Sequence, residues 1–266
     1  MSSAPLARRL LTVSGVEQLG AYLVLRVDDR DGPPPAAGQF AMLEAEERWG
    51  GGEDERPYLA RAFSVARVRD GQAHFLLEDV GPGSRRLCEL GAGERLWVLG
   101  PLGQGFTAPP QGRRAILVGG GVGIAPLAIL QDTLAREATV LLGFRDAARA
   151  KGAALLDHAI VATDDGSAGH HGLVTDLLAA ELRRDPFAIV YACGPAGMLE
   201  GVRAICAQAS VPAQLALEAG MACGFGACFG CVVPRRGGGY VRVCVDGPVI
   251  DAAELDHVES HAGAPA

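Results

Sequence analysis

Four cysteines near the end of the chain have the spacing of a metal-binding loop. Cys223, Cys228 and Cys231 follow the pattern C-x4-C-x2-C, and Cys244 lies further along the chain. This is the spacing of a plant-type [2Fe–2S] site. A two-iron cluster needs four thiolates, and the glycines between these cysteines allow a short loop to turn tightly and point N–H groups at sulfur. The pattern therefore favours a [2Fe–2S] cluster held by the four cysteines.

A structural zinc site and a pair of disulfides are the alternatives. Zinc sites usually combine two C-x2-C hooks, whereas here Cys228 and Cys231 form a single one. Disulfides are typical of short secreted chains, but this chain has 266 residues and no long apolar segment among its first twenty. The spacing favours the cluster and leaves both alternatives open.

Composition limits the partners and the compartment. The formal charge of −7 argues against nucleic acid and against an anionic membrane surface as partners. No apolar run reaches the roughly 18 residues of a membrane span. Seven cysteines without an export signal indicate a reducing compartment, with the cytoplasm as the expected location.

The first hundred residues predict a small β-barrel. Short apolar strands alternate with turn clusters rich in glycine, proline and aspartate, which is typical of a closed antiparallel barrel. The segment 46–55 is expected to be a polar excursion between two of these strands. The predicted strands cover residues 10–13, 21–27, 39–43, 62–68, 73–77 and 95–99.

Two stretches of this predicted barrel could together hold a diphosphate. Arg61 opens an apolar strand that ends at Ser64, and a turn containing Gly83 and Ser84 precedes a helical pattern. The guanidinium would supply charge-assisted donors, and the turn would supply backbone N–H groups at a helix start. Alternatively, the arginine is simply solvated and the turn simply has an N-cap serine.

After residue 110 the pattern changes to alternating strands and helices. An apolar run at 115–118 leads into a glycine loop and then into a helical segment. Bare backbone lets a nucleotide approach, and a helix N-terminus favours its negative charge. The loop departs from the dinucleotide fingerprint in its last position, which is Pro126. Its glycines are Gly119, Gly120, Gly121 and Gly123.

The end of the next strand, residues 139–144, could set the nucleotide preference. Asp146 would bind a ribose hydroxyl of NADH, whereas Arg145 would favour NADPH, and both could simply face solvent. The sequence does not choose between these alternatives.

A second loop is expected at the same edge of the sheet. The strand at 187–192 runs into Cys193, Gly194 and Pro195, and Met198 follows at the start of a helix. The carboxyl ends of parallel strands share one edge, so this loop and the glycine loop should lie together. Cys193 is either a small buried residue or a cofactor contact.

A final strand is expected at 211–217, before the cysteine loop. The segment 240–245 alternates like a strand and is expected to carry Cys244.

The order of these motifs resembles the ferredoxin–NADP reductase superfamily, in which a flavin barrel precedes a nicotinamide domain. The similar segments are RAFS at 61–64 for the flavin strand, GPGS at 81–84 for the flavin-diphosphate turn, GGGVGIAPL at 119–127 for the nucleotide loop and YACGPAGML at 191–199 for the C-G-P motif.

The tail narrows this resemblance to the electron transfer subunits of type B dihydroorotate dehydrogenase. MACGFGACFGCVVP, followed by YVRVCVDGPVI, is similar to their cluster-binding tail, and so is GPLGQGF at 100–106, which otherwise predicts an interdomain turn. One departure is that Ala62 and Phe63 stand where the family often has proline and isoleucine. Phe63 could instead stack on the isoalloxazine.

The resemblance implies a β plus α/β architecture in three regions. An antiparallel FAD-binding barrel would span 1–110, a parallel-sheet NAD(P)-binding domain 111–216, and a small [2Fe–2S]-binding tail 217–266. The implied FAD contacts are Arg61, Ala62, Phe63, Ser64, Leu77, Glu78, Asp79, Gly83 and Ser84. The implied NAD(H) contacts are Gly119, Gly120, Gly121, Gly123, Cys193, Gly194, Pro195 and Met198. The implied cluster ligands are Cys223, Cys228, Cys231 and Cys244.

The resemblance also implies a role as an NAD-linked flavin and iron–sulfur oxidoreductase subunit in pyrimidine biosynthesis. The chain would pass electrons between an FMN-containing dihydroorotate dehydrogenase catalytic subunit and NAD+, in a heterotetramer with two copies of each subunit. No general base or nucleophile constellation stands out, so the cofactors are expected to carry the chemistry. Phe225 and Phe229 would either dock the partner or pack over the cluster.

Two other functions are compatible with the motifs. A reductase subunit of this type could serve another partner, such as a hydrogenase, a sulfide-linked reductase or an oxygenase. A regulatory nucleotide-binding protein with a structural zinc would be colourless, whereas flavin and iron would give a yellow-brown protein.

Overall fold

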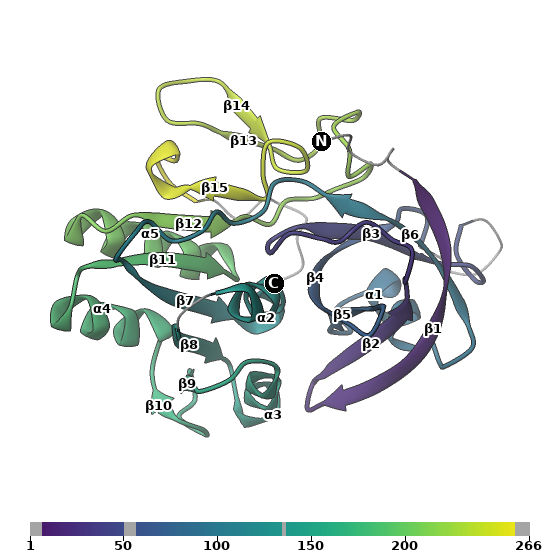
Figure 1. The fold of residues 1–266 in the computed structure, drawn as a ribbon, viewed down its shortest axis with the longest axis horizontal. Helices are drawn as coiled ribbons and strands as arrows, with labels where there is room; N and C mark the ends of the chain where they lie inside the picture. Colours follow the sequence, from purple (N-terminus) through teal and green to yellow (C-terminus); the bar gives the residue numbers. More distant parts are fainter. Residues whose placement is uncertain (1–6, 51–56, 135–136, 259–266) are drawn as a thin grey trace.

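The protein consists of a β-barrel beside a helix-covered sheet, with a small tail above both (Figure 1). The computed structural model describes residues 7–50, 57–134 and 137–258. Most of the glycine-rich part of the predicted excursion at 46–55 lies outside these residues, as do both ends of the chain. None of the described helices is long and apolar enough to cross a membrane.

The first half of the chain forms the predicted closed antiparallel barrel. Within the described residues its strand order is β1-β2-β5-β4-β3-β6. Alternating apolar residues on each strand fill the interior, and a short helix, α1 (Pro82–Cys88), lies between the last two strands in the sequence. The strands are β1 (Arg8–Leu19), β2 (Tyr22–Asp28), β3 (Phe40–Ala45), β4 (Arg61–Arg69), β5 (Gln72–Leu77) and β6 (Arg95–Leu102).

The second half forms the predicted parallel sheet, whose described strands have the order β10-β9-β8-β7-β11-β12-β15. The strands are β7 (Arg114–Gly120), β8 (Thr139–Phe144), β9 (Ala159–Thr163), β10 (His170–His171), β11 (Ala188–Cys193), β12 (Ala213–Ala216) and β15 (Val249–Asp251). The helices are α2 (Ala125–Thr133), α3 (Ala147–Ala150), α4 (Val174–Arg184) and α5 (Ala196–Ala209). Short 3-10 helices lie at η1 (Gly121–Ile124), η2 (Lys151–Leu155) and η3 (Ala252–Glu254).

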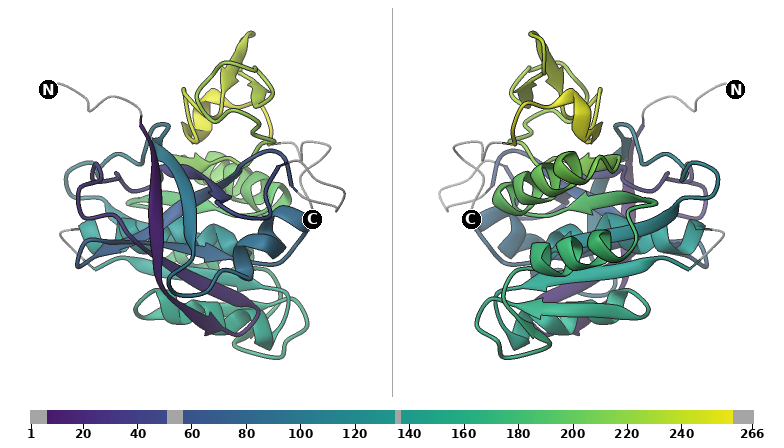
Figure 2. Two further views of the ribbon diagram at one scale, coloured as in Figure 1. Left: turned by 90° about the vertical axis from the view of Figure 1, so that its right-hand side faces the viewer. Right: turned by 90° about the vertical axis from the view of Figure 1, so that its left-hand side faces the viewer.

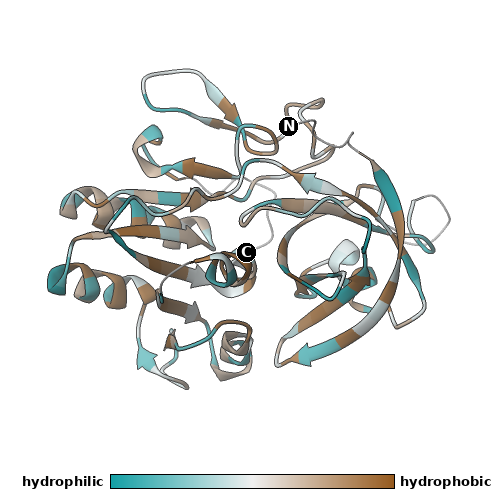
Figure 3. Ribbon diagram, viewed as in Figure 1, coloured by the Kyte–Doolittle hydropathy of each residue, from teal (hydrophilic) through white to brown (hydrophobic). Residues whose placement is uncertain are grey.

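Consecutive residues of the buried strands point to opposite faces of this sheet. Ala115 and Leu117 of β7 pack in one core cluster with α2 and the barrel, whereas Ile116 and Val118 pack in a second cluster with α4 and α5. The central strands are accordingly almost entirely apolar, while charged residues mark the outer side of α4 (Figure 3). The central strands are therefore buried on both faces, with α2 lying between one face and the barrel (Figure 1).

The tail joins the sheet as well as holding the cysteines. Its hairpin pairs β13 (Val232–Pro234) with β14 (Tyr240–Arg242) and stands above both domains (Figure 2). The chain then returns, and β15 pairs antiparallel with β12 at the edge of the sheet. The sequence pattern did not predict this strand, which ties the tail to the nucleotide domain.

The segment GPLGQGF at 100–106 leads from the barrel to the nucleotide domain and also contacts the tail, so it is more than an interdomain turn. The Gln104 N–H donates to the carbonyl of Gly247 in the tail, and the Phe106 N–H donates to Ala37 in the barrel. A Cβ at Gly103 would lie 2.5 Å from the Gly247 oxygen. A side chain would not fit there, so the backbone of the junction can meet the tail only through glycine.

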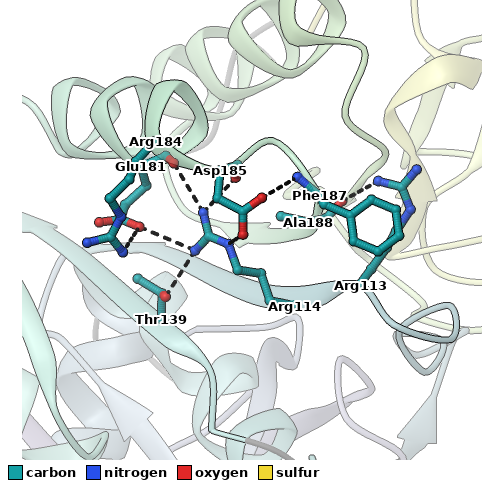
Figure 4. Close-up of polar contacts among 8 residues, drawn as sticks. All are labelled: Arg113, Arg114, Thr139, Glu181, Arg184, Asp185, Phe187 and Ala188. Carbon is teal, nitrogen blue, oxygen red and sulfur yellow. Dashed lines mark hydrogen bonds and ion pairs between the residues drawn. The ribbon is translucent and has the colours of Figure 1, made fainter.

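Arg114 fastens the amino-terminal edge of the sheet, opposite the predicted cofactor edge (Figure 4). Its guanidinium donates to Asp185 Oδ2 at 3.0 Å, Glu181 Oε2 at 3.2 Å and Thr139 Oγ1 at 3.3 Å. It also donates to the carbonyls of Glu181 and Asp185, at 3.1 and 2.8 Å. These carbonyls belong to the end of α4, where a helix lacks internal partners. Arg114 therefore links β7 and β8 to the end of α4.

Replacing Arg114 with methionine should lower the free energy of unfolding by about 2–3 kcal/mol, because the carbonyls of Glu181 and Asp185 lose this donor. The mostly buried Glu181 carboxylate would keep only the exposed Arg184 as its ion-pair partner. Urea unfolding monitored by circular dichroism measures this loss. Arg113→Met is the matched control: Arg113 donates to Ala188 O and stacks on Phe187, so its loss should cost about 1 kcal/mol or less. Equal stability of the two variants would contradict this role of Arg114.

Candidate cofactor sites

The four cysteines of the tail lie together as two pairs. Cys231 and Cys244 are buried, and their Sγ atoms are 3.2 Å apart. Cys223 and Cys228 form a second, more exposed pair whose side chains are hydrogen-bonded. Across the described ranges, no three His, Cys, Asp or Glu side chains converge as ligands of one metal ion. Two pairs of thiols suit a two-iron cluster, in which each iron is bound by two thiolates.

Disulfides do not account for these cysteines. All seven cysteines of the chain lie within the described residues and are free thiols. The 3.2 Å between Cys231 Sγ and Cys244 Sγ is well beyond the roughly 2.05 Å of a disulfide bond.

The cysteine loop directs N–H groups at sulfur. Burial opposes ionisation of Cys223, but the N–H groups of Phe225 and Cys228, the Cys228 thiol and the N–H of Ala227 lower the pKa of Cys223 to about 6. The Gly230 N–H donates to Cys228 Sγ at 3.4 Å. This environment favours the thiolates that metal ions require.

In the inner pair, the pKa of Cys244 shifts in the opposite direction. Burial, and then the neighbouring Cys231 thiol, raise the pKa of Cys244 to about 12. The Cys244 N–H donates to Cys231 Sγ at 3.4 Å. The Cys244 thiol therefore needs a metal ion to displace its proton.

The prediction that one strand covers 240–245 and carries Cys244 is wrong, because the strand ends before this cysteine. β14 stops at Arg242, and Cys244 lies in the following turn. The Asp246 carboxylate accepts from the Arg242 N–H at 2.8 Å, and the Asp246 N–H donates to the Arg242 carbonyl. This aspartate turn takes the place of strand pairing and turns Cys244 toward Cys231.

The two segments predicted to share a diphosphate lie against each other. A Cβ at Gly83 would be 2.5 Å from Nε of Arg61, so the arginine side chain lies directly on the first turn of α1, which already includes Gly83 and Ser84. The Arg61 guanidinium donates to the Leu59 carbonyl and lies 6.0 Å from the ring centroid of Trp49. The structure thus places a cation beside the first backbone N–H groups of α1.

Ser84 stabilises this turn with its side chain. Its Oγ donates to the Gly81 carbonyl at 3.1 Å and accepts from the Val80 N–H at 3.0 Å, and the residue is buried. The hydroxyl is therefore engaged within the protein, which leaves the backbone of Gly83 and Ser84 as the candidate donors.

The other residues implied for FAD line the same end of the barrel. Phe63 packs partly against the barrel core, and Ala62 on the opposite face of β4 is exposed. Leu77 is fully buried at the end of β5. Glu78 accepts from Arg149 of the nucleotide domain at 3.0 Å, and Asp79 pairs with Arg85 at 3.2 Å. Glu78 therefore lies where the barrel meets the second domain.

The two loops predicted for NAD(H) pack directly on each other. A Cβ at Gly123 would be 2.6 Å from the backbone of Cys193 and Gly194, and one at Gly120 would be 2.6 Å from Met198 Sδ. Glycine is therefore required on the first loop. The residues that the sequence analysis singled out on β7 and β11 form one edge, as the parallel topology predicts.

Comparison with known proteins places the chain in a family. Residues 218–256 match the model of the iron–sulfur cluster binding domain of dihydroorotate dehydrogenase B. The electron transfer subunit of dihydroorotate dehydrogenase B (NAD(+)) from Caldanaerobacter subterraneus subsp. tengcongensis is 38% identical over 229 residues, covering 84% of this chain and 88% of the relative. The Bacillus caldolyticus subunit of the same name is 41% identical, covering 75% and 80%.

The chain belongs to the family of dihydroorotate dehydrogenase B electron transfer subunits.

Solved structures agree with this assignment at the level of the fold. A chain of an NADH-dependent reduced ferredoxin–NADP oxidoreductase, studied for flavin-based electron bifurcation, has a TM-score of 0.77 and 25% identity, with 97% of this chain and 92% of that chain covered. The ferredoxin reductase of carbazole 1,9a-dioxygenase has a TM-score of 0.67 and 23% identity, covering 79% and 68%. The ferredoxin reductase-like fold is thus confirmed.

In this member of the electron transfer subunit family, Asp146 has an internal partner. Its carboxylate accepts from the Arg149 N–H at 2.9 Å, which caps α3, and from Arg149 Nη1 at 2.7 Å. Arg149 also binds Glu78. The residue expected to bind the ribose therefore belongs to an ion-pair network that reaches the barrel, which spacing along the sequence did not indicate.

Sequence reasoning missed Glu218. It directly follows the apolar segment that ends at Leu217 and lines a crevice together with Gly194 and Ala196. Glu218 reaches solvent, yet dense protein around its carboxyl raises the pKa. Burial, and then the Glu218 charge, raise the pKa of Cys193, so Cys193 is a neutral buried thiol. A charged residue directly after a buried strand was the available signal.

Tyr22 was also missed. It is fully buried where the barrel meets the nucleotide domain, and its hydroxyl has no hydrogen-bond partner among the described residues. A Cβ at Gly121 would lie 3.9 Å from this hydroxyl. An apolar strand gives no sign of such an orphaned group, because it arises where two domains meet.

Replacing Cys228 with serine should remove the iron and the visible absorbance of the cluster while FAD remains bound. Cys228 is exposed, so its loss should leave the core of the tail intact. Absorbance and iron analysis of the purified variant test this. Cys88→Ser, at a half-buried cysteine outside the tail, is the control and should keep both cofactors. An unchanged iron content in the Cys228 variant would reject the ligand assignment.

Replacing Arg61 with alanine should weaken FAD binding about tenfold or more, because a charge-assisted contact to phosphate is lost. Equilibrium dialysis of the deflavinated protein measures the affinity. Arg69→Ala is the matched control, since Arg69 lies at the other end of β4 and pairs loosely with Asp132 at 3.7 Å. If both variants bind FAD like the unmodified protein, Arg61 does not belong to the site.

Proposed function

We propose that the chain passes electrons between an FMN-containing dihydroorotate dehydrogenase catalytic subunit and NAD+, by way of a [2Fe–2S] cluster and FAD. The observation that carries this proposal is the pairing of four free thiols in a tail that contacts both the barrel and the nucleotide sheet. Such a tail suits a cluster that must exchange electrons with a flavin on one side and a partner on the other.

The residues of the chain would hold the cofactors at the junction of the two domains. Arg61 with the backbone of Gly83 and Ser84 would bind the FAD diphosphate, and Ala62 to Ser64 with Leu77 to Asp79 would line the flavin. The paired loops at 119–123 and 193–198 would bind NAD(H). When bound, a flavin exchanges two electrons with nicotinamide and single electrons with an iron–sulfur cluster.

The charges at the carboxyl edge of the sheet support NAD(H) over NADP(H). Asp146 follows β8, and Asp164 and Asp165 follow β9, where their N–H groups donate to the carbonyls of Phe144 and Arg145. These carboxylates would repel a 2′-phosphate, whereas a ribose hydroxyl can donate to Asp146. Arg149, which could attract a phosphate, is already paired with Asp146 and Glu78. The exposed Arg145 is outnumbered by these three aspartate carboxylates.

Exposed aromatic residues support a partner at the tail. Phe225, Phe229 and Tyr240 are 49%, 61% and 72% exposed. Phe229 is held by the Arg242 guanidinium, 5.5 Å from its ring centroid. Aromatic surface of this kind is enriched at protein interfaces, so these residues belong to the proposed docking face. The reducing compartment is also part of the proposal, because the seven cysteines are free thiols.

A reductase subunit for another partner is the second candidate. It is favoured by the similarity along nearly the whole chain to a chain of an NADH-dependent reduced ferredoxin–NADP oxidoreductase. The same cofactor sites would serve that role, so the partner decides between the two.

Mixing the purified holoprotein with an FMN-containing dihydroorotate dehydrogenase catalytic subunit tests the proposal. Dihydroorotate should then reduce NAD+, followed at the absorbance of NADH, and the two chains should migrate together in gel filtration. The catalytic subunit alone is the control and should not reduce NAD+. NADH oxidation by a dye, without any dihydroorotate-dependent reaction or association, would favour the second candidate.

A further inference from the structure

The cluster loop rests on the barrel strand that neighbours the flavin strand. β3 pairs antiparallel with β4, and Met42 lies opposite Ala62 in this register. A Cβ at Gly224, which adjoins Cys223, would lie 2.5 Å from Cγ and 2.8 Å from Sδ of Met42. The Met42 side chain therefore lies in van der Waals contact with the backbone of the cluster loop.

Met42 points out of the barrel and into the core of the tail. Its neighbours Ala41 and Leu43 belong to the hydrophobic core of the barrel. Met42 instead belongs to the second hydrophobic core, which also contains Cys231 and Cys244. Met42 is only 2% exposed, although it lies on the outer face of a barrel. The tail thus covers a patch of the barrel wall, and Met42 is the residue of that patch opposite the flavin strand.

The φ angle of Gly224 is +80°, a conformation that favours glycine. The loop consequently approaches β3 as bare backbone. An unbranched thioether can fill the irregular space beneath such a loop, and adjacent strands are about 4.8 Å apart. The distance from the flavin strand to the cluster loop is therefore set by one strand spacing and one side chain.

We propose that Met42 is a positioning residue that fixes the cluster relative to the flavin and thereby sets the rate of electron exchange between them. This inference rests on the proposed function. In each exchange one electron leaves the reduced flavin and reduces one ferric ion of the oxidised cluster, and NADH supplies the flavin with two electrons as hydride. Met42 lies on β3 of the barrel and belongs to neither predicted nucleotide loop, so the hydride step should be independent of it.

The test follows the two steps separately in the holoprotein after rapid mixing with NADH. Met42→Ala should slow reduction of the cluster several-fold, while reduction of FAD by NADH keeps its rate. The midpoint potential of the cluster should shift to a more positive value, because water would reach the loop and stabilise the more charged reduced form. Met42→Leu, which conserves volume, should restore both quantities.

The matched control is Ile250→Ala. Ile250 is 5% exposed and packs in the same hydrophobic core as Met42. It comes, however, from β15 at the edge of the nucleotide sheet. Its loss should leave the rate of cluster reduction unchanged. If Met42→Ala does not retain the cluster, Met42→Val shortens the side chain on a strand that favours β-branched residues and takes its place.

Cluster reduction at the unmodified rate in both shortened Met42 variants would overturn the inference. An equal slowing in Ile250→Ala would also overturn it, because general loosening of the tail would then explain the effect. Absence of FAD or iron from the unmodified protein would instead overturn the proposed function, so the two failures are distinguishable.

Discussion

The structure depends on bringing thiols from distant parts of the tail into two pairs. Cys231 and Cys244 are 13 residues apart, yet their sulfurs are in contact, because an aspartate turn after β14 directs Cys244 inward. The loop carrying Cys223 and Cys228 is too rich in glycine to hold this shape alone. It rests on the barrel wall beneath Gly224, and the segment that follows Cys244 is tied to the nucleotide sheet by β15. The cluster site is therefore built by three parts of the chain.

At the other predicted cofactor sites, too, separate segments are held together by close contacts at glycine. Gly123 meets the backbone of Cys193 and Gly194, Gly83 supports the Arg61 side chain, and Gly103 meets Gly247 of the tail. Each contact leaves no space for a Cβ. The predicted sites for FAD, NAD(H) and the cluster are thus connected by contacts that tolerate little displacement, which suits a protein whose proposed role is to hold cofactors at fixed separations.

Much of this architecture could be predicted from the sequence, since alternating and continuous apolar runs identify the barrel and the parallel sheet. What could not be predicted depends on tertiary contacts. β15 has three residues and becomes a strand only by pairing with β12. Glu218 and Tyr22 acquire unusual surroundings where separate elements meet. Asp146 lies near the expected distance from the glycine loop, but its pairing with Arg149 depends on the local turn into α3.

The metal content of protein purified without exposure to oxygen tests the central claim most directly. The account predicts two iron atoms and two acid-labile sulfides per chain, together with one FAD, because two thiol pairs can serve two irons. A protein that contained one zinc per chain and no iron would contradict it, and the assignment of an electron transfer role would fail with it.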